Sequence, residues 1–169
     1  MSMRFYRATS RESALQRDRR RLLTALWALP TVPAWGGAML SSAVELDITS
    51  DGDNLAFIPN RLNCVTGANV RLRLHHTGRI IDDPHDWVLL KPGMENAFLA
   101  DADKQQDDKR VIPPHDRNMV VAATPLCARG KTVKVNFIAP APGNYPFVCS
   151  VPGHGETMHG TLAVTVKPQ

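Results

Sequence analysis

Short stretches in which apolar and polar residues alternate recur along most of the chain. The alternation spans 44–48, 70–74, 133–137 and 162–166, where aliphatic or aromatic residues occupy every second position. Period-two alternation is typical of β-strands with one buried face, because successive side chains point to opposite sides of a strand. Helical periodicity is confined to about 96–106. Together these patterns predict an all-β sandwich with one short helical insertion.

Two further segments place reactive side chains next to predicted strands. His85 is the first residue of the run 85–90. The apolar end of this run predicts a buried strand with the imidazole at its start. Tyr145, Phe147 and Cys149 alternate, so we expect them to share one face of a strand. Cys149 would then leave a strand that is anchored by two aromatic side chains.

The segment after Cys149 contains two more residue types that bind metals. His154 and Met158 follow Cys149 by five and nine positions, and Pro152-Gly153 favours a turn between them. One thiolate, two imidazoles and a weak axial thioether are the ligand set of a blue-copper electron-transfer site. His85 supplies the second imidazole. The sequence therefore predicts four ligands of one copper ion, His85, Cys149, His154 and Met158.

These residues resemble a known family. The segment 145–161, together with His85-Asp86-Trp87, is similar to the cupredoxins, and among them to the azurins and auracyanins. The resemblance extends from about Val44 to the C-terminus and is most specific in its last third. It implies a Greek-key β-sandwich of the cupredoxin type, in which 96–106 corresponds to a helical flap. It also implies one type 1 copper that passes single electrons between redox proteins such as cytochromes or a copper/haem oxidoreductase.

The resemblance is incomplete around the first histidine. Azurins have Asn after this histidine and Gly before it, whereas this chain has Asp86 and Pro84. An ionised Asp86 would stabilise Cu(II) and lower the reduction potential, and Pro84 would alter the loop that offers a distant axial carbonyl. His76 resembles the nonligand histidine of azurins, for which we expect a hydrogen-bonded structural role. Strand alternation points His159 away from the site, so Met158 rather than His159 is the expected ligand.

Other metal sites and functions fit the sequence less well. Zinc also accepts Cys and His, but it has no use for a thioether, and the chain contains no Cys-x-x-Cys pair. A copper-delivery protein of the cell envelope is the alternative function. It would be expected to cluster Met or His residues, and the six methionines do not cluster. A sandwich that had lost copper would be expected to lack ligands, and all four are present.

An enzymatic function has no support in the residue patterns. Multicopper oxidation needs His-x-His pairs for a trinuclear cluster, and none occurs in the sequence. No Ser, His and Asp arrangement with a recognisable local context is present either. We therefore expect an electron carrier that transforms no substrate.

Composition and charge limit the remaining possibilities. The 169 residues suit one modest domain, and 43% hydrophobic with 21% charged residues is ordinary for a globular protein. The net charge of +4 comes from 1–43, which holds seven of the 20 basic and two of the 16 acidic residues. The remaining 13 basic and 14 acidic residues give the later part a net charge of −1. No basic stripe with interleaved aromatic residues occurs there, so nucleic-acid binding has no support.

Residues 1–43 have the pattern of an export signal. Arg19-Arg20-Arg21 precedes an apolar run at 22–29, and paired arginines before two leucines resemble a twin-arginine signal. Small residues at Ser41 and Ala43 favour cleavage at this point. We therefore expect a periplasmic or otherwise extracytoplasmic protein.

Cleavage there would leave a cupredoxin domain over 44–169. An uncleaved membrane anchor is the alternative, and membrane association would follow only in that case. Pro30 and Pro33 interrupt the apolar run well short of the roughly 20 residues that a spanning helix needs, which favours removal.

The three cysteines leave one pairing open. With Cys149 as a copper ligand, Cys64 and Cys127 could form a disulfide or remain buried thiols. Neither occupies the position of the disulfide familiar in azurins, so the resemblance does not establish a bridge.

Overall fold

A computed structural model describes residues 43–105, 112 and 116–168. The predicted export signal therefore lies outside the described residues, except for Ala43. Among the described residues, no helix is both long enough and apolar enough to cross a membrane.

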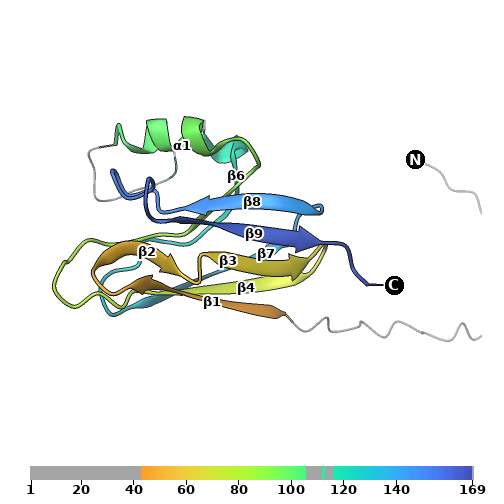
Figure 1. Ribbon diagram of the computed structural model, residues 1–169, viewed down its shortest axis with the longest axis horizontal. Helices are drawn as coiled ribbons and strands as arrows, with labels where there is room; N and C mark the ends of the chain where they lie inside the picture. Colours follow the sequence, from red (N-terminus) through yellow and green to blue (C-terminus); the bar gives the residue numbers. More distant parts are fainter. Residues whose placement is uncertain (1–42, 106–111, 113–115, 169) are drawn as a thin grey trace, which may run out of the picture. The chain divides into compact units, whose positions relative to one another are not determined.

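The described residues form two β-sheets that face each other (Figure 1). The first sheet has four strands in the order β2-β1-β4-β7. β1 runs parallel to β4, and the other two pairs are antiparallel. Its strands are β1 (Val44–Asp51), β2 (Asn54–Ile58), β4 (Asn69–His75) and β7 (Thr132–Ile138).

The second sheet has five strands in the order β3-β9-β8-β5-β6. β3 runs parallel to β9, and the remaining pairs are antiparallel. This sheet carries the residues of the predicted copper site at the ends of its central strands. Its strands are β3 (Arg61–Val65), β5 (Val88–Leu90), β6 (Val120–Ala123), β8 (Gly143–Val148) and β9 (His159–Thr165).

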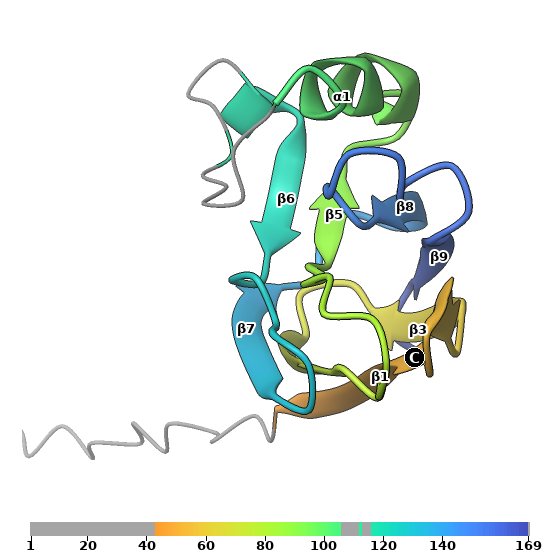
Figure 2. The ribbon, with the colours of Figure 1, turned by 90° about the vertical axis from the view of Figure 1, so that its left-hand side faces the viewer.

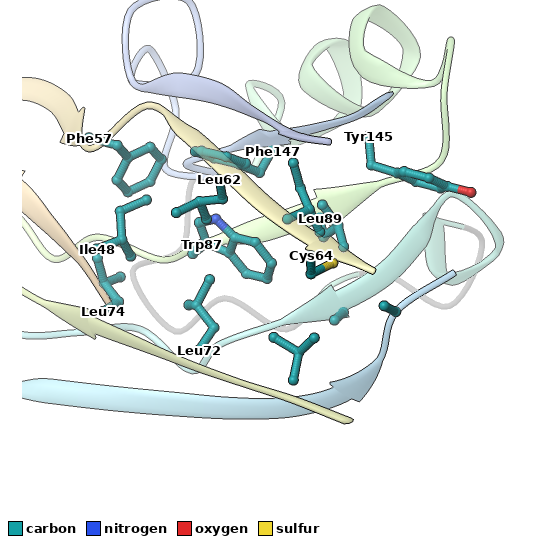
Figure 3. Packing of buried hydrophobic residues seen from close by; sticks show 14 of the residues in the cluster. Ile48, Phe57, Leu62, Cys64, Leu72, Leu74, Trp87, Leu89, Tyr145 and Phe147 are labelled. Atoms are coloured by element: carbon teal, nitrogen blue, oxygen red, sulfur yellow. The ribbon is translucent and has the colours of Figure 1, made fainter. Parts of the chain in front are cut away.

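The main hydrophobic core lies between the two sheets. Figure 3 shows Trp87 between Leu72 of the first sheet and Phe147 of the second. The ring centroid of Trp87 lies 5.6 Å from that of Phe147 and 5.9 Å from that of Phe137. The side chains that alternate inward from β4, Val70, Leu72 and Leu74, are fully buried. The predicted alternation therefore does form the core of a sandwich.

A short helix, α1 (Glu95–Ala102), packs on the outer face of the second sheet. In Figures 1 and 2 it lies beyond β5 and β8, on the side away from the first sheet. Phe98 and Ala102 are buried in a small second cluster with Val88, Leu90 and Val148. This arrangement is possible because β5 and β8 have both faces covered. A single 3₁₀ turn, η1 (Asp116–Asn118), precedes β6.

The structure confirms the predicted all-β sandwich with a short helix, and it corrects several details. The helix begins one residue before the predicted range and ends at Ala102, because Asp103 already caps it. Val166 lies beyond β9 and is 68% exposed, since the paired strand β3 ends at Val65 opposite Thr165.

Three strands were missed by the sequence analysis. β2 is short, β3 alternates over only four residues (Arg61 to Cys64), and β6 carries four apolar residues with no alternation. The predicted strand at His85 is also shorter than expected, because regular pairing in β5 starts only at Val88.

Candidate metal centre

His85 is held by the framework of the sandwich. It forms an isolated antiparallel bridge with Cys127, in which the His85 N–H donates to the Cys127 carbonyl (3.1 Å) and the Cys127 N–H to the His85 carbonyl (2.6 Å). Two residues later, the Trp87 N–H donates to the Thr124 hydroxyl (3.0 Å), and the Thr124 N–H donates to the Trp87 carbonyl (2.9 Å). These four bonds fix the backbone that carries the imidazole.

Cys149 follows β8 directly. Tyr145, Phe147 and Cys149 all belong to the main core cluster, as the predicted shared face requires. The Cys149 side chain is fully buried, and its Sγ lies 3.8 Å from Nδ1 of His154. The strand therefore brings the thiol to one end of the core, next to the His154 imidazole that is predicted to share a metal with it.

The loop between β8 and β9 carries His154 and Met158 (Figure 2). The His154 N–H donates to the Val151 carbonyl (2.9 Å), and the His154 carbonyl accepts from the N–H groups of Thr157 (3.1 Å) and Met158 (2.8 Å). The Cys149 N–H donates to the Met158 carbonyl (2.9 Å) and closes the loop at its base. The sequence between the two strands thus folds back on itself, as the Pro and Gly residues predicted.

Three of the predicted side chains converge. One ring nitrogen from His85, one from His154 and Sγ of Cys149 all lie within 4.8 Å of one another. Nδ1 of His85 is buried and has no hydrogen-bond partner among the residues that the structure describes. Buried polar atoms nearly always have a partner, so this nitrogen indicates a group that is bound there. A thiol, two imidazoles and the fully buried Met158 in the same loop are residues that fit copper.

Asp86 ties the first histidine segment to the loop. Its carboxylate accepts two hydrogen bonds from Ser150, one from the backbone N–H and one from the hydroxyl, each 2.6 Å long. Both residues are buried, at 5% and 4% exposure. Since Asp86 is next to His85 and Ser150 is next to Cys149, these bonds join the backbones of two predicted ligands.

His76 packs against His85. The rings of His76 and His85 stack with centroids 4.3 Å apart and an interplanar angle of 24°. Nδ1 of His76 accepts from the Gly78 N–H (3.0 Å), so the proton is on Nε2, which donates to the Asp83 carbonyl (2.8 Å). His76 therefore has the hydrogen-bonded structural role that its resemblance to the azurin histidine implied.

Burial shifts the proton equilibria of two of the predicted ligands, His85 and Cys149. Burial, with smaller contributions from positive charge on His76 and His154, lowers the pKa of His85 to about 4. Burial raises the pKa of the Cys149 thiol far above its usual value, and the nearby Asp86 carboxylate adds to this shift. In the metal-free protein Cys149 is thus a thiol and His85 a neutral imidazole. A metal that binds here must displace the thiol proton.

The whole sandwich matches a known family of metal proteins. The family model of copper-binding proteins, plastocyanin/azurin family, matches residues 44–165. The chain belongs to this family. It is 35% identical to auracyanin-A of Chloroflexus aurantiacus over 125 residues, which cover 73% of this chain and 76% of that protein. It is 30% identical to the azurin of Methylobacillus flagellatus over 150 residues, which cover 85% and 97% of the two chains.

The solved structures of the family have the same architecture. The structure of auracyanin A, described as a "blue" copper protein of Chloroflexus aurantiacus, matches with a TM-score of 0.61 at 32% sequence identity. The match covers 73% of this chain and 99% of that one. The predicted cupredoxin-like Greek-key sandwich of a plastocyanin/azurin family member is therefore confirmed.

Sequence reasoning missed several residues that organise this family site. Thr124 and Cys127 clamp the segment around His85, although neither stands in a recognisable motif. Cys127 is a free buried thiol whose Sγ lies 3.1 Å from the Lys131 carbonyl, and Cys64 is free and buried as well. The suggested Cys64–Cys127 disulfide is therefore not formed, and the alternative of two buried thiols holds.

Proposed function

We propose that this plastocyanin/azurin family member is a single-electron carrier with one type 1 copper. The proposed copper ligands are His85, Cys149, His154 and Met158. The observation that carries the proposal is the orphaned, buried Nδ1 of His85, which lies in a cluster with the Cys149 thiol and the His154 ring. Copper, when bound, supplies a reversible one-electron couple between Cu(I) and Cu(II).

The protein's part in this function is to hold the ligands in place. His85 is fixed by paired backbone bonds to Cys127, and the ligand loop is closed by the bond between Cys149 and Met158. A site that is already held before the metal changes oxidation state has little to rearrange. Slow rearrangement would limit electron transfer, so this restraint favours a carrier over a substrate-transforming enzyme.

His154 is the proposed route for electrons to and from the surface. It is 7% exposed, and its loop neighbours Pro152 and Gly153 are exposed and uncharged. A small surface of this kind suits weak, transient docking, because redox encounters generally use small interfaces. The partners would be redox proteins, such as cytochromes or a copper/haem oxidoreductase, in the periplasm or another extracytoplasmic compartment.

Copper delivery is less well supported by the same geometry. A delivery protein must release its metal to a partner, whereas Cys149 and Met158 are fully buried and His85 is 3% exposed. A metal bound there would therefore be enclosed by protein on the side of these three residues. This burial favours retention of copper through many redox cycles.

A copper titration tests the proposal. Cu(II) added to residues 44–169 should produce an intense thiolate-to-copper absorption band that saturates at one equivalent and that a mild reductant bleaches reversibly. Zn(II) in a parallel titration should bind without colour and should be displaced by copper. Tight binding without such a band would favour copper delivery, and no binding of either metal would contradict both functions.

A further inference from the structure

The ligand loop contacts the helix α1 as well as the sandwich. The N–H of Gly153 donates a hydrogen bond to Oδ1 of Asp103, at 3.0 Å. Gly153 is the residue immediately before His154, and its φ of +75° is one that glycine adopts readily. The bond therefore acts on the turn that aims His154, and it comes from a residue 50 positions away in the chain.

Asp103 is itself held in place by the helix. Its own N–H caps α1 by donating to the Leu99 carbonyl (2.8 Å). The helix is fixed on the second sheet by the buried side chains of Phe98 and Ala102. The Asp103 carboxylate is therefore presented to the loop by an element that is anchored to the same sheet that carries Cys149.

A second contact links the helix to the other side of His154. A β-carbon at Gly155 would overlap the Leu99 side chain and would lie 3.0 Å from the Cys149 carbonyl oxygen. Leu99 therefore packs directly against the Gly155 backbone. Both neighbours of His154 in the sequence, Gly153 and Gly155, thus touch α1 or its cap.

We propose that Asp103 is a positioning residue of the copper site and that α1 is a second anchor of the ligand loop. The first anchor is the buried Asp86–Ser150 pair at the start of the loop. The backbone bonds of His154 to Val151, Thr157 and Met158 lie within the loop and would turn with it as a unit. Asp103 fixes that unit relative to the sandwich. The inference rests on the proposed role of His154 as a ligand.

Three variants separate the hydrogen bond from the charge. Asp103→Ala removes both, whereas Asp103→Asn removes the charge and keeps an oxygen that can accept from Gly153. Asp101→Ala is the matched control, because it removes an acid from the same helix whose carboxylate pairs with Lys104 (2.8 Å). Urea unfolding of each variant shows whether the fold is intact.

Amide hydrogen exchange of the metal-free protein tests the contact itself. A hydrogen bond of ordinary net strength corresponds to about a fivefold effect, so Asp103→Ala should raise the exchange rate of the Gly153 amide about fivefold. Asp103→Asn and Asp101→Ala should leave that rate within about twofold of the original. Equal exchange in all four proteins would overturn the proposed anchor without any reference to copper.

The copper-loaded protein tests the consequence for the metal. Asp103→Ala should lose copper to a chelator about fivefold faster than the original protein and should change the shape of the Cu(II) paramagnetic resonance spectrum. Asp103→Asn should restore both properties, and Asp101→Ala should alter neither. An unchanged rate and spectrum in Asp103→Ala, with a blue original protein, would overturn the positioning role alone. A colourless original protein would contradict the proposed function instead.

Discussion

The two histidines of the site, His85 and His154, are held by different parts of the molecule. His85 belongs to the framework: its backbone is paired with Cys127, and its ring stacks on His76. His154 belongs to a loop whose own turns shape it and whose position depends on bonds from Ser150 and Gly153 to two carboxylates. Changes on the framework side should therefore affect stability first, and changes on the loop side should affect the metal first.

The largest effect is expected at Cys149, where the two sides meet. Cys149→Ser should abolish the thiolate-to-copper band completely, because an alcohol does not supply the sulfur-to-copper charge transfer. Cys64→Ser is the matched control, since Cys64 is also a buried thiol but lies on β3, away from the cluster. Visible absorption of the copper-loaded proteins measures both, and a surviving band in Cys149→Ser would refute the ligand assignment.

A framework change should lower stability with little effect on colour. Thr124→Val keeps the side-chain shape but removes the hydroxyl that accepts from the buried Trp87 N–H. An unsatisfied buried donor costs about 1–3 kcal/mol, so the free energy of unfolding should fall by about that amount. Urea titration measures this loss. The absorption maximum should stay in place. A strong shift of the band at unchanged stability would contradict the view that framework changes affect stability before they affect the metal.

A change at Met158, the proposed thioether ligand, should move the reduction potential and leave the metal bound. Met158→Leu replaces a thioether by a hydrocarbon of similar size, and the weaker donor set should favour Cu(I). We expect the reduction potential to rise by roughly 100 mV, which is about two tenfold steps for a one-electron couple. Spectroelectrochemical titration measures the shift. An unchanged potential would show that Met158 is not axial.

The buried carboxylate of Asp86, which joins the framework to the loop, should affect the reduction potential less than Met158 does, and in the same direction. Asp86→Asn keeps an oxygen that can accept one of the two bonds from Ser150, but it removes a negative charge that favours Cu(II). The potential should rise by roughly 50 mV, close to one tenfold step. The same titration measures it, with Asp82→Asn as a control at an exposed acid. A fall in potential would contradict the electrostatic argument.

The pH dependence of the metal-free protein should show a further, modest effect on stability. His85 has a pKa of about 4 in the folded state, compared with about 6.5 in an unfolded chain. The unfolded state therefore binds more protons between these values, and stability should fall as the pH drops from about 6.5 to about 4. After allowance for screening by water, we expect a loss of about 1–2 kcal/mol. Urea midpoints at pH 7 and pH 4.5 should show this loss, and His85→Asn should show less of it.

The sequence was most informative where one local pattern was enough. Strands β1, β4, β7 and β9 have alternating residues because one face of each strand is buried. The proposed loop ligands could be predicted because Cys149, His154 and Met158 are close together in the chain. His85 could be predicted only from its place at the start of an apolar run, 64 positions before Cys149, because no shared motif links it to that loop.

The contacts that hold the site could not be predicted in the same way. Asp103 meets Gly153 across 50 positions, and Thr124 meets Trp87 across 37. Such contacts depend on how the strands and α1 pack, and a single Asp or Thr outside a motif carries no signal of its partner. Strand β6 could not be predicted either, because packing covers both of its faces and its residues therefore do not alternate.

Electron self-exchange between the Cu(I) and Cu(II) forms tests the central claim most directly. If the framework and the anchored loop hold the copper ligands in one geometry, electrons should pass quickly between two molecules that meet at the His154 surface. Broadening of nuclear magnetic resonance lines in mixtures of the two forms should give a rate constant of at least about 10⁴ M⁻¹s⁻¹, within a few powers of ten of typical protein encounter rates. A rate constant below about 10² M⁻¹s⁻¹ would contradict the account, because so slow an exchange would indicate a site that rearranges when it changes oxidation state.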